Sequence, residues 1–176
     1  MRIGVSGTHF SGKSTLVRAL VKALPDYIGI DEPYFILEQE GYLFSHPPLV
    51  QDYEQQCKRS VQLILESDKR TIFDRCPLDF LAYALAVGKD RVDLDFWKEE
   101  IEKGIQFLDF ILFLPIEEKD QIPIPPSENK KLRQKVDENL YELLMEDSLA
   151  VLGKTKVIEI TGTLEKRVAR VIDLKL

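Results

Sequence analysis

The chain has 176 residues, of which 44% are hydrophobic and 31% charged, and its formal net charge is −6. This size and composition are typical of a single globular domain, predicted here to span residues 1–176, and the acidic balance argues against a general nucleic-acid-binding surface. No apolar run approaches the roughly 20 residues that cross a bilayer, and no cationic leader is apparent. Because Cys57 and Cys76 lack metal-like spacing, we expect two free thiols in a reducing compartment. Together these features predict a cytoplasmic protein without nucleic-acid or membrane partners.

Strands and helices alternate along the predicted chain. In chain order the patterns predict a strand at 3–6, a helix at 13–24, a strand at 27–31, helices at 34–41 and 49–67, a strand at 70–74, helices at 78–87 and 94–106, a strand at 107–114, a helix at 128–152, a strand at 155–160 and a helix at 164–172. This alternation predicts a three-layer α/β fold with a mainly parallel sheet. The proline-rich and charged residues 115–127 indicate a loop, part of a lid segment at about 115–135.

The link between the first strand and the first helix carries a phosphate-binding motif. Residues 7–14 match G-x-x-x-x-G-K-[ST], in which backbone N–H groups surround phosphate oxygens at a helix N-terminus. Lys13 is expected to reach the β- and γ-phosphates, Ser14 to supply a hydroxyl to Mg²⁺, and Thr15 to bond the α-phosphate. The residues predicted to bind nucleotide in this motif are Gly7, Ser11, Gly12, Lys13, Ser14 and Thr15.

Acidic residues follow the second and third predicted strands, where ligands bind in parallel sheets. Asp74 stands where an acid would order Mg²⁺, and Arg75 beside it would clamp phosphate or restrain Asp74. The alternative for this pair is a helix-capping Asp74 and an exposed Arg75. Glu32 is the predicted general base, with Asp31 as a secondary candidate and a plain surface position as the alternative. Asp79 is either a helix cap or an acceptor-pocket residue.

The segment from Ala23 to Cys57 contains no Lys or Arg. A phosphorylated acceptor would need fixed cations nearby, so this acidic segment favours a neutral or cationic hydroxyl compound. Its aromatic residues could stack on a base, although core positions are expected for most of them. These residues are Tyr34, Phe35, Tyr42, Phe44 and Tyr53.

Basic residues follow the proline-rich segment. Arg133 is the residue predicted to neutralise charge on the transferring phosphoryl group when the lid closes, and the alternative is a solvated helix face. The loop 161–163 after the fifth strand is predicted to line the adenine site, with Thr163 contacting the nucleotide and Arg167 nearby. His9, within the phosphate motif, is expected to face solvent without a catalytic role.

Taken together, the phosphate motif, Asp31-Glu32-Pro33, Asp74-Arg75 and the loop 161–163 resemble the nucleoside and nucleotide kinase branch of P-loop proteins. The run from Asp74 to Tyr83 is similar to the D-R-x-P-L-D-x-x-A-Y run of AAA-like, ribosylnicotinamide-kinase-type domains, and the Glu-Pro pair also resembles deoxynucleoside kinases. The resemblance implies a five-stranded parallel sheet in the order 2-3-1-4-5, ATP with Mg²⁺, Glu32 or Asp31 as base and a basic lid. Cys76, which replaces a small hydroxyl residue, and the single lid arginine depart from the pattern.

These features predict an ATP-dependent phosphotransferase that moves the γ-phosphoryl group to a hydroxyl of a nucleoside-like small molecule. Lys13 and Arg133 would neutralise charge, Ser14 and Asp74 would hold Mg²⁺, and Glu32 would accept the proton. The alternatives are a nucleoside monophosphate kinase and a non-kinase, ATP-binding regulatory ATPase. No guanine-reading Asn/Thr-Lys-x-Asp run is apparent, so ATP is preferred to GTP. A monomer or a homodimer is expected.

Overall fold

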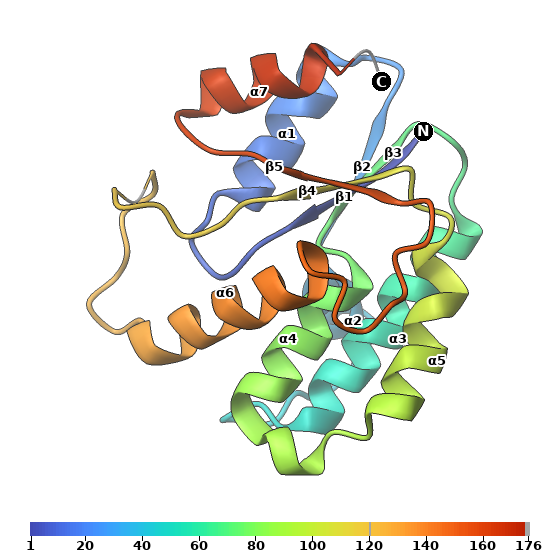
Figure 1. Cartoon of the computed structure of the whole chain (residues 1–176), viewed down its shortest axis with the longest axis vertical. Coiled ribbons are helices and arrows are strands. Elements are labelled where there is room, and N and C mark those ends of the chain that lie inside the picture. Colours follow the sequence, from blue (N-terminus) through green and yellow to red (C-terminus); the bar gives the residue numbers. More distant parts are fainter. Residues whose placement is uncertain (120, 175–176) are drawn as a thin grey trace.

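The protein, described by a computed structural model over residues 1–119 and 121–174, is built on one sheet (Figure 1). Residue 120, inside the predicted lid segment, and residues 175–176, at the end of the predicted domain, lie outside the described residues. The sheet is parallel, with its strands in the order β2-β3-β1-β4-β5. The strands are β1 (Arg2–Ser6), β2 (Ile28–Ile30), β3 (Thr71–Asp74), β4 (Phe110–Phe113) and β5 (Lys156–Glu159). The predicted sheet and strand order are therefore confirmed.

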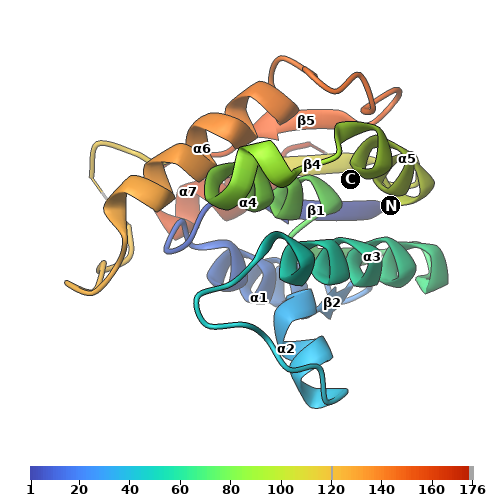
Figure 2. The same ribbon diagram turned by 90° about the horizontal axis from the view of Figure 1, so that it is seen from below.

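Helices cover both faces of the sheet, as the predicted three-layer fold requires. They are α1 (Lys13–Ala23), α2 (Pro33–Gln39), α3 (Val50–Glu66), α4 (Pro77–Gly88), α5 (Leu94–Ile105), α6 (Lys130–Leu144) and α7 (Leu164–Ile172), with a short 3-10 turn, η1 (Lys89–Arg91), after α4. In Figure 1, α1 and α7 cover one face, while α3, α4, α5 and α6 lie on the other. The small α2 packs against α3, as Figure 2 shows from below.

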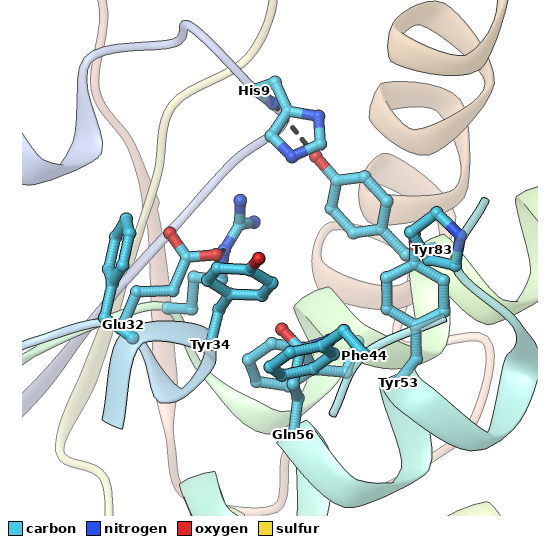
Figure 3. A pocket seen from close by; sticks show the side chains of 11 residues that line it. His9, Glu32, Tyr34, Phe44, Tyr53, Gln56 and Tyr83 are labelled. Atoms are coloured by element: carbon cyan, nitrogen blue, oxygen red, sulfur yellow. Dashed lines mark hydrogen bonds and ion pairs between the residues drawn. The ribbon is translucent and has the colours of Figure 1, made fainter. Parts of the chain in front are cut away.

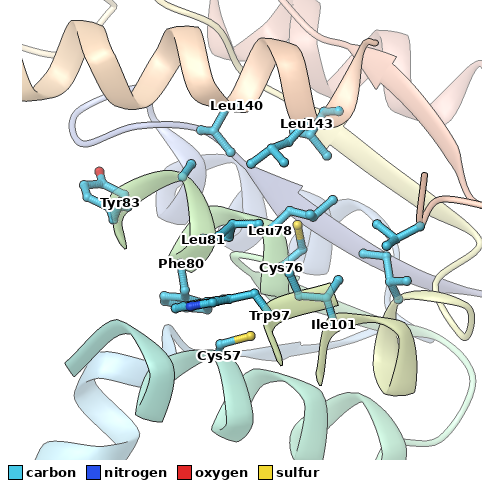
Figure 4. Packing of buried hydrophobic residues seen from close by; sticks show 14 of the residues in the cluster. Cys57, Cys76, Leu78, Phe80, Leu81, Tyr83, Trp97, Ile101, Leu140 and Leu143 are labelled. Carbon is cyan, nitrogen blue, oxygen red and sulfur yellow. The ribbon is translucent and has the colours of Figure 1, made fainter. Parts of the chain in front are cut away.

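Two hydrophobic cores lie between the sheet and the helices that cover its two faces. One lies under α1 and α7 and includes Ile3, Val5 and Leu16. The larger core lies under α3 to α6, where Trp97, Leu78 and Leu140 pack with both cysteines (Figure 4). The inner strands β1, β3 and β4 are largely buried because both of their faces are covered, and β4, with the sequence FILF, is an unbroken apolar run. Cys57 and Cys76 are buried free thiols, as predicted.

The sixth helix ends earlier than predicted. The apolar spacing predicted a helix over 128–152, but α6 stops at Leu144 and residues 145–155 form turns. Asp147 takes a left-handed backbone conformation, with φ of 47°, and its carboxylate accepts hydrogen bonds from the amides of Val151 and Leu152. This local bonding by an Asp side chain competes with helical hydrogen bonds and explains the early end.

The strand order brings distant loops to one edge of the sheet. Because β1 lies between β3 and β4, the loop after β1 is flanked by the ends of both neighbours, and Val5 pairs directly with Asp74. The carboxyl ends of parallel strands are where ligands bind in such sheets. Among the described residues, no helix combines the length and apolar character that a bilayer crossing needs.

Candidate active site

The loop from Gly7 to Ser14 turns from the end of β1 into the first turn of α1. Gly7 and Gly12 have φ of 152° and 94°, which L side chains rarely adopt. A Cβ on Gly7 would lie 2.6 Å from the Leu114 carbonyl oxygen, and one on Gly12 would lie 3.0 Å from Arg167 Nη1. Backbone angle and close approach therefore both require glycine at these two positions.

Cationic side chains from four elements hold the carbonyl groups of this loop. The bonds run from Arg75 Nη1 to Gly7 O (3.2 Å), from Lys13 Nζ to Thr8 O (2.7 Å), from Arg133 Nε to His9 O (2.9 Å) and from Arg167 Nη1 to Ser11 O (2.6 Å). A carbonyl oxygen that faces a cation turns the N–H of the same peptide the other way, where it can meet an anion, except in the Thr8–His9 peptide, whose N–H donates to the Tyr83 hydroxyl. The loop is thus polarised before any ligand binds.

A cavity of about 230 Å³ lies against this loop and the start of α1. Residues 7–14 are called the phosphate loop and this cavity the phosphate cavity. The residues that line it include Gly12, Lys13, Ser14 and Thr15, which supply the first amides of the helix. Such amides have no partner within their own helix, and they form a site for phosphate. Burial, aided by Arg75, lowers the pKa of Lys13 to about 8, so a bound anion would favour its charged form.

Asp74 and Ser14 have the chemistry of a Mg²⁺ site. Burial raises the pKa of Asp74, although Lys13 and the hydrogen bond from Ser14 act in the opposite direction. Asp74 Oδ1 is buried without a hydrogen-bond partner, which is the state expected of an oxygen that serves a cation. No group of three or more His, Cys, Asp or Glu that could hold a metal occurs among the described residues.

Arg75 joins the end of β3 to the ends of β1 and β2. Its Nε donates to Glu32 Oε1 at 2.5 Å, and its Nη1 donates to Asp79 Oδ1 at 3.3 Å. Burial alone would raise the pKa of Glu32, but Arg75 and Lys13 outweigh it and lower that pKa below its usual value. Glu32 is therefore a carboxylate, whereas Asp31, its predicted substitute, is exposed at the surface.

Asp79 is a helix cap that also binds the phosphate loop. Its Oδ2 accepts from the Cys76 amide at the start of α4, and its Oδ1 accepts from the Gly7 amide at 3.1 Å. The side chain is fully buried and does not line the aromatic pocket. Of the two predicted alternatives, the structure supports the cap.

An aromatic pocket of about 270 Å³ opens beside Glu32 and Arg75 (Figure 3). Tyr34 and Phe44 stack with ring centroids 4.3 Å apart, and Tyr53 stacks on Tyr83 at 5.5 Å. Most of these aromatic residues were expected in the core. Of the five aromatic residues between Ala23 and Cys57, only Tyr53 is buried in the core, whereas Tyr34, Phe35 and Phe44 form walls of the pocket. The helix α2 and the loop after it place Tyr34, Phe35 and Phe44 in the same pocket as Tyr53 and Gln56 from the first half of α3.

The phosphate cavity and the aromatic pocket share the wall formed by His9, Glu32 and Arg75. The expectation that His9 faces solvent was incomplete: its side chain is 44% exposed but lines both spaces. Partial burial and the positive charges of Arg75 and Lys13 lower the pKa of His9, so the imidazole is neutral. The Tyr83 hydroxyl accepts from the His9 amide at 3.0 Å.

Tyr83 and Gln56 are pocket residues to which the sequence patterns assigned no role. Tyr83 packs against Arg75, whose guanidinium carbon lies 5.1 Å from the ring centroid. Gln56 projects from α3, and its amide nitrogen donates to the Asp52 carbonyl. Tyr83 belongs to the run from Asp74 that resembles the kinase pattern, so the sequence could have indicated that it lies at the site. Helical spacing places Gln56 on one face of its helix but does not show that this face lines a pocket.

Five predicted site residues do not line the phosphate cavity, namely Gly7, Ser11, Asp74, Arg133 and Thr163. The Ser11 hydroxyl is buried beside Gly7. Thr163 caps α7 by accepting from the Lys166 amide. Arg133 is buried against the outside of the loop, where it binds the His9 carbonyl. Their predicted contacts with nucleotide remain predictions.

No protein-family model and no curated protein matches the sequence, but solved structures match the fold. Deoxyadenosine kinase from M. mycoides, solved with dATP, has a TM-score of 0.65 at 14% identity, with 99% of this chain and 98% of that chain covered. NadR in complex with NAD and AMP-PNP has a TM-score of 0.70 at 21% identity, over 98% of this chain and 48% of that chain. Thymidylate kinase from Candida albicans has a TM-score of 0.67 at 17% identity, over 98% and 89%.

The chain thus spans about half the length of NadR and most of the length of the two kinases. Identities this low establish the shared architecture and leave the substrate open. The resemblance predicted from the motifs is confirmed at that level: the chain has the fold of P-loop nucleoside and nucleotide kinases.

Proposed function

We propose that this chain is an ATP-dependent kinase that transfers the γ-phosphoryl group to a hydroxyl of a nucleoside-like small molecule. The observation that carries this proposal is the shared wall, because Glu32, Arg75 and His9 line both the phosphate cavity and the aromatic pocket. A hydroxyl of a molecule in the pocket would lie beside the end of a triphosphate in the cavity. Such juxtaposition is the main requirement of phosphoryl transfer.

The ionised Glu32 is suited to be the proton acceptor. As the acceptor oxygen bonds to the γ-phosphorus, the bond to the bridging oxygen of ADP breaks and the hydroxyl proton passes to the Glu32 carboxylate. Lys13 and Arg75 lie where they would balance charge on the phosphoryl oxygens, and we retain Arg133 as a further cation brought by the lid. Asp74 and Ser14 would hold Mg²⁺, which supplies charge neutralisation at phosphate oxygens when bound.

The charges of the pocket favour an acceptor without a phosphate. Arg75 is the only Lys or Arg among the residues that line the described pocket, and Glu32 and Asp79 already pair with it. A nucleoside monophosphate would bring two negative charges to this place without a dedicated cation. The apolar, aromatic lining instead suits the flat face of a base. We therefore favour a nucleoside-like acceptor over a nucleotide.

A phosphotransfer screen tests this function directly. Purified protein with Mg²⁺-ATP would receive nucleosides, nucleoside monophosphates or ribosylnicotinamide, and ADP and phosphorylated product would be measured. We expect a nucleoside-like compound to stimulate ADP release with matching product. Stimulation by monophosphates alone would establish a nucleotide kinase instead. ADP release that no acceptor changes would reject a kinase and favour a regulatory ATPase.

Substitution of Glu32 tests the role of the shared wall. Glu32→Gln removes the proton acceptor and should lower kcat by about 10²–10⁴-fold, the usual contribution of a general base. Its affinity for ATP, measured by calorimetry, should change little. The matched control is Asp31→Asn, since Asp31 is the exposed neighbouring carboxylate. Full activity in Glu32→Gln would remove Glu32 from this role.

A further inference from the structure

Arg167 reaches the phosphate loop from α7, on the opposite side from Arg75. Its side chain is 4% exposed, and its Nη1 donates to the Ser11 carbonyl at 2.6 Å. Its Nε donates to the Gly162 carbonyl at 2.8 Å. One guanidinium therefore connects the phosphate loop with the loop between β5 and α7.

Glu117 completes this connection from the segment that follows β4. Its carboxylate accepts from Arg167 Nη2 at 2.7 Å and from the Gly162 amide at 2.9 and 3.1 Å. Three loops thus meet in a closed ring of charge-assisted hydrogen bonds, which are among the strongest available to side chains. Because the pair is largely buried, its geometry is fixed more firmly than that of a surface pair.

The hydrogen bond from Arg167 to the Ser11 carbonyl also fixes the direction of the Gly12 N–H, because both groups belong to one planar peptide. In a planar trans peptide the C=O and the following N–H point in opposite directions. Arg167, by holding the Ser11 carbonyl, directs the Gly12 amide away from α7. Gly12 lines the phosphate cavity, and glycine at this position leaves room for the guanidinium, because a Cβ there would lie only 3.0 Å from Arg167 Nη1.

We infer that Arg167, held in place by Glu117, is a positioning residue that orients the Gly12 amide for triphosphate binding. This inference rests on the nucleotide site of the proposed function, but it assigns Arg167 no contact with the adenine base. Arg167 acts through the Ser11–Gly12 peptide and therefore affects the binding of the phosphates of the nucleotide. Glu117 links the same peptide to the predicted lid segment, so that segment also contributes to donor affinity.

Equilibrium binding to two ligands separates the phosphate effect from a base effect. Calorimetry with Mg²⁺, and without any acceptor, would compare ATP with inorganic tripolyphosphate, which carries the same phosphates and no base. The variants are Arg167→Met, which removes the charge, Arg167→Lys, which keeps one donor, and Glu117→Gln. Matched controls are Arg170→Met on the exposed side of α7 and Glu118→Gln, the exposed neighbour of Glu117. Urea unfolding of each variant reports stability separately.

We expect Arg167→Met to weaken ATP and tripolyphosphate by the same factor, roughly tenfold, the scale of one charged hydrogen bond. Arg167→Lys should recover part of this loss, Glu117→Gln should show a smaller loss, and both controls should bind as the wild type does. If Arg167→Met fails to fold, the decision passes to Arg167→Lys and Glu117→Gln, which preserve side-chain volume.

Two results would overturn the inference while leaving the proposed function intact. One is weaker ATP binding with unchanged tripolyphosphate binding, which would assign Arg167 to the base. The other is unchanged binding of both ligands in every variant that folds. A wild-type protein that binds neither ligand would instead reject the nucleotide site itself, and the inference with it.

Discussion

Asp137, on α6, is a partly buried carboxylate that accepts a hydrogen bond from the Ile116 amide at 3.0 Å. Burial raises its pKa to about 6, against an opposing effect of that bond and of Arg133, while Glu138 and Glu159 add to the rise. The folded protein thus keeps a proton that the unfolded chain releases near pH 4. The contribution of Asp137 to stability should therefore fall as pH rises from about 4 to 6, because at this site the native state binds more protons than the unfolded chain does.

The variant Asp137→Asn tests this titration, since its amide oxygen can still accept from Ile116. We expect the melting temperature of the variant, relative to wild type, to increase between pH 4 and pH 7. Thermal unfolding at several pH values would measure the difference, and other groups titrate equally in both proteins. The exposed neighbour supplies the control variant, Glu138→Gln. A difference independent of pH would show that Asp137 does not titrate in this range.

Single residues also show how far sequence patterns reach. The phosphate motif has fixed spacing, so Gly12, Lys13 and Ser14 could be placed on the site in advance. Glu32 and Asp74 could be placed because strand ends in a parallel sheet converge. Ser11 and Arg133 show the limit. Residue type and position in the chain do not reveal which side of a loop a side chain occupies.

At the scale of elements, α4 depends on one carboxylate for both its start and its contact with the phosphate loop. Asp79→Ala removes the cap of the Cys76 amide and the acceptor of the Gly7 amide. The usual cost of a lost cap is about 0.5–2 kcal/mol, and burial of the freed groups adds to it. We expect a loss of at least about 2 kcal/mol, measured by urea unfolding.

A second helix provides the comparison for this prediction. Asp93 caps α5 by accepting from the amides of Asp95 and Phe96, and these bonds are exposed. Asp93→Ala should therefore cost only about 1 kcal/mol. Equal losses in the two variants would mean that the contact of Asp79 with Gly7 adds nothing.

Elements were predicted with uneven success for physical reasons. The inner strand β4 is an unbroken apolar run, so its existence was plain, but the predicted start at Phe107 fell in the turn that ends α5. The predicted extension of α6 failed because Asp147 makes bonds that helical spacing does not encode. Where periodicity is lacking, as around Phe44 and Pro48, the sequence offered base stacking by the aromatic residues only as an alternative to core packing, and it did not locate the pocket that these two residues line.

At the scale of the whole molecule, ligand binding should be visible as stability. A ligand present at about 100 times its Kd stabilises the native state by about 2.7 kcal/mol, which for this size corresponds to roughly 5–10 °C. Mg²⁺-ATP should raise the melting temperature by such an amount, and EDTA should reduce the rise because Asp74 and Ser14 then lose their ion. Lys13→Ala should show little rise with either mixture. A wild-type protein with an unchanged melting temperature would contradict a nucleotide site.

The two halves of the site come from separate stretches of the chain. Six of the nine residues that line the phosphate cavity belong to residues 9–15, whereas six residues of the aromatic pocket belong to the single segment from 34 to 56. Those six are Tyr34, Phe35, Phe44, Pro48, Tyr53 and Gln56. Substitutions within one short segment can therefore change which acceptor is chosen without disturbing the donor machinery. Divergence between descendants of such a gene should concentrate there, and a chimera that exchanges only this segment should exchange acceptor preference.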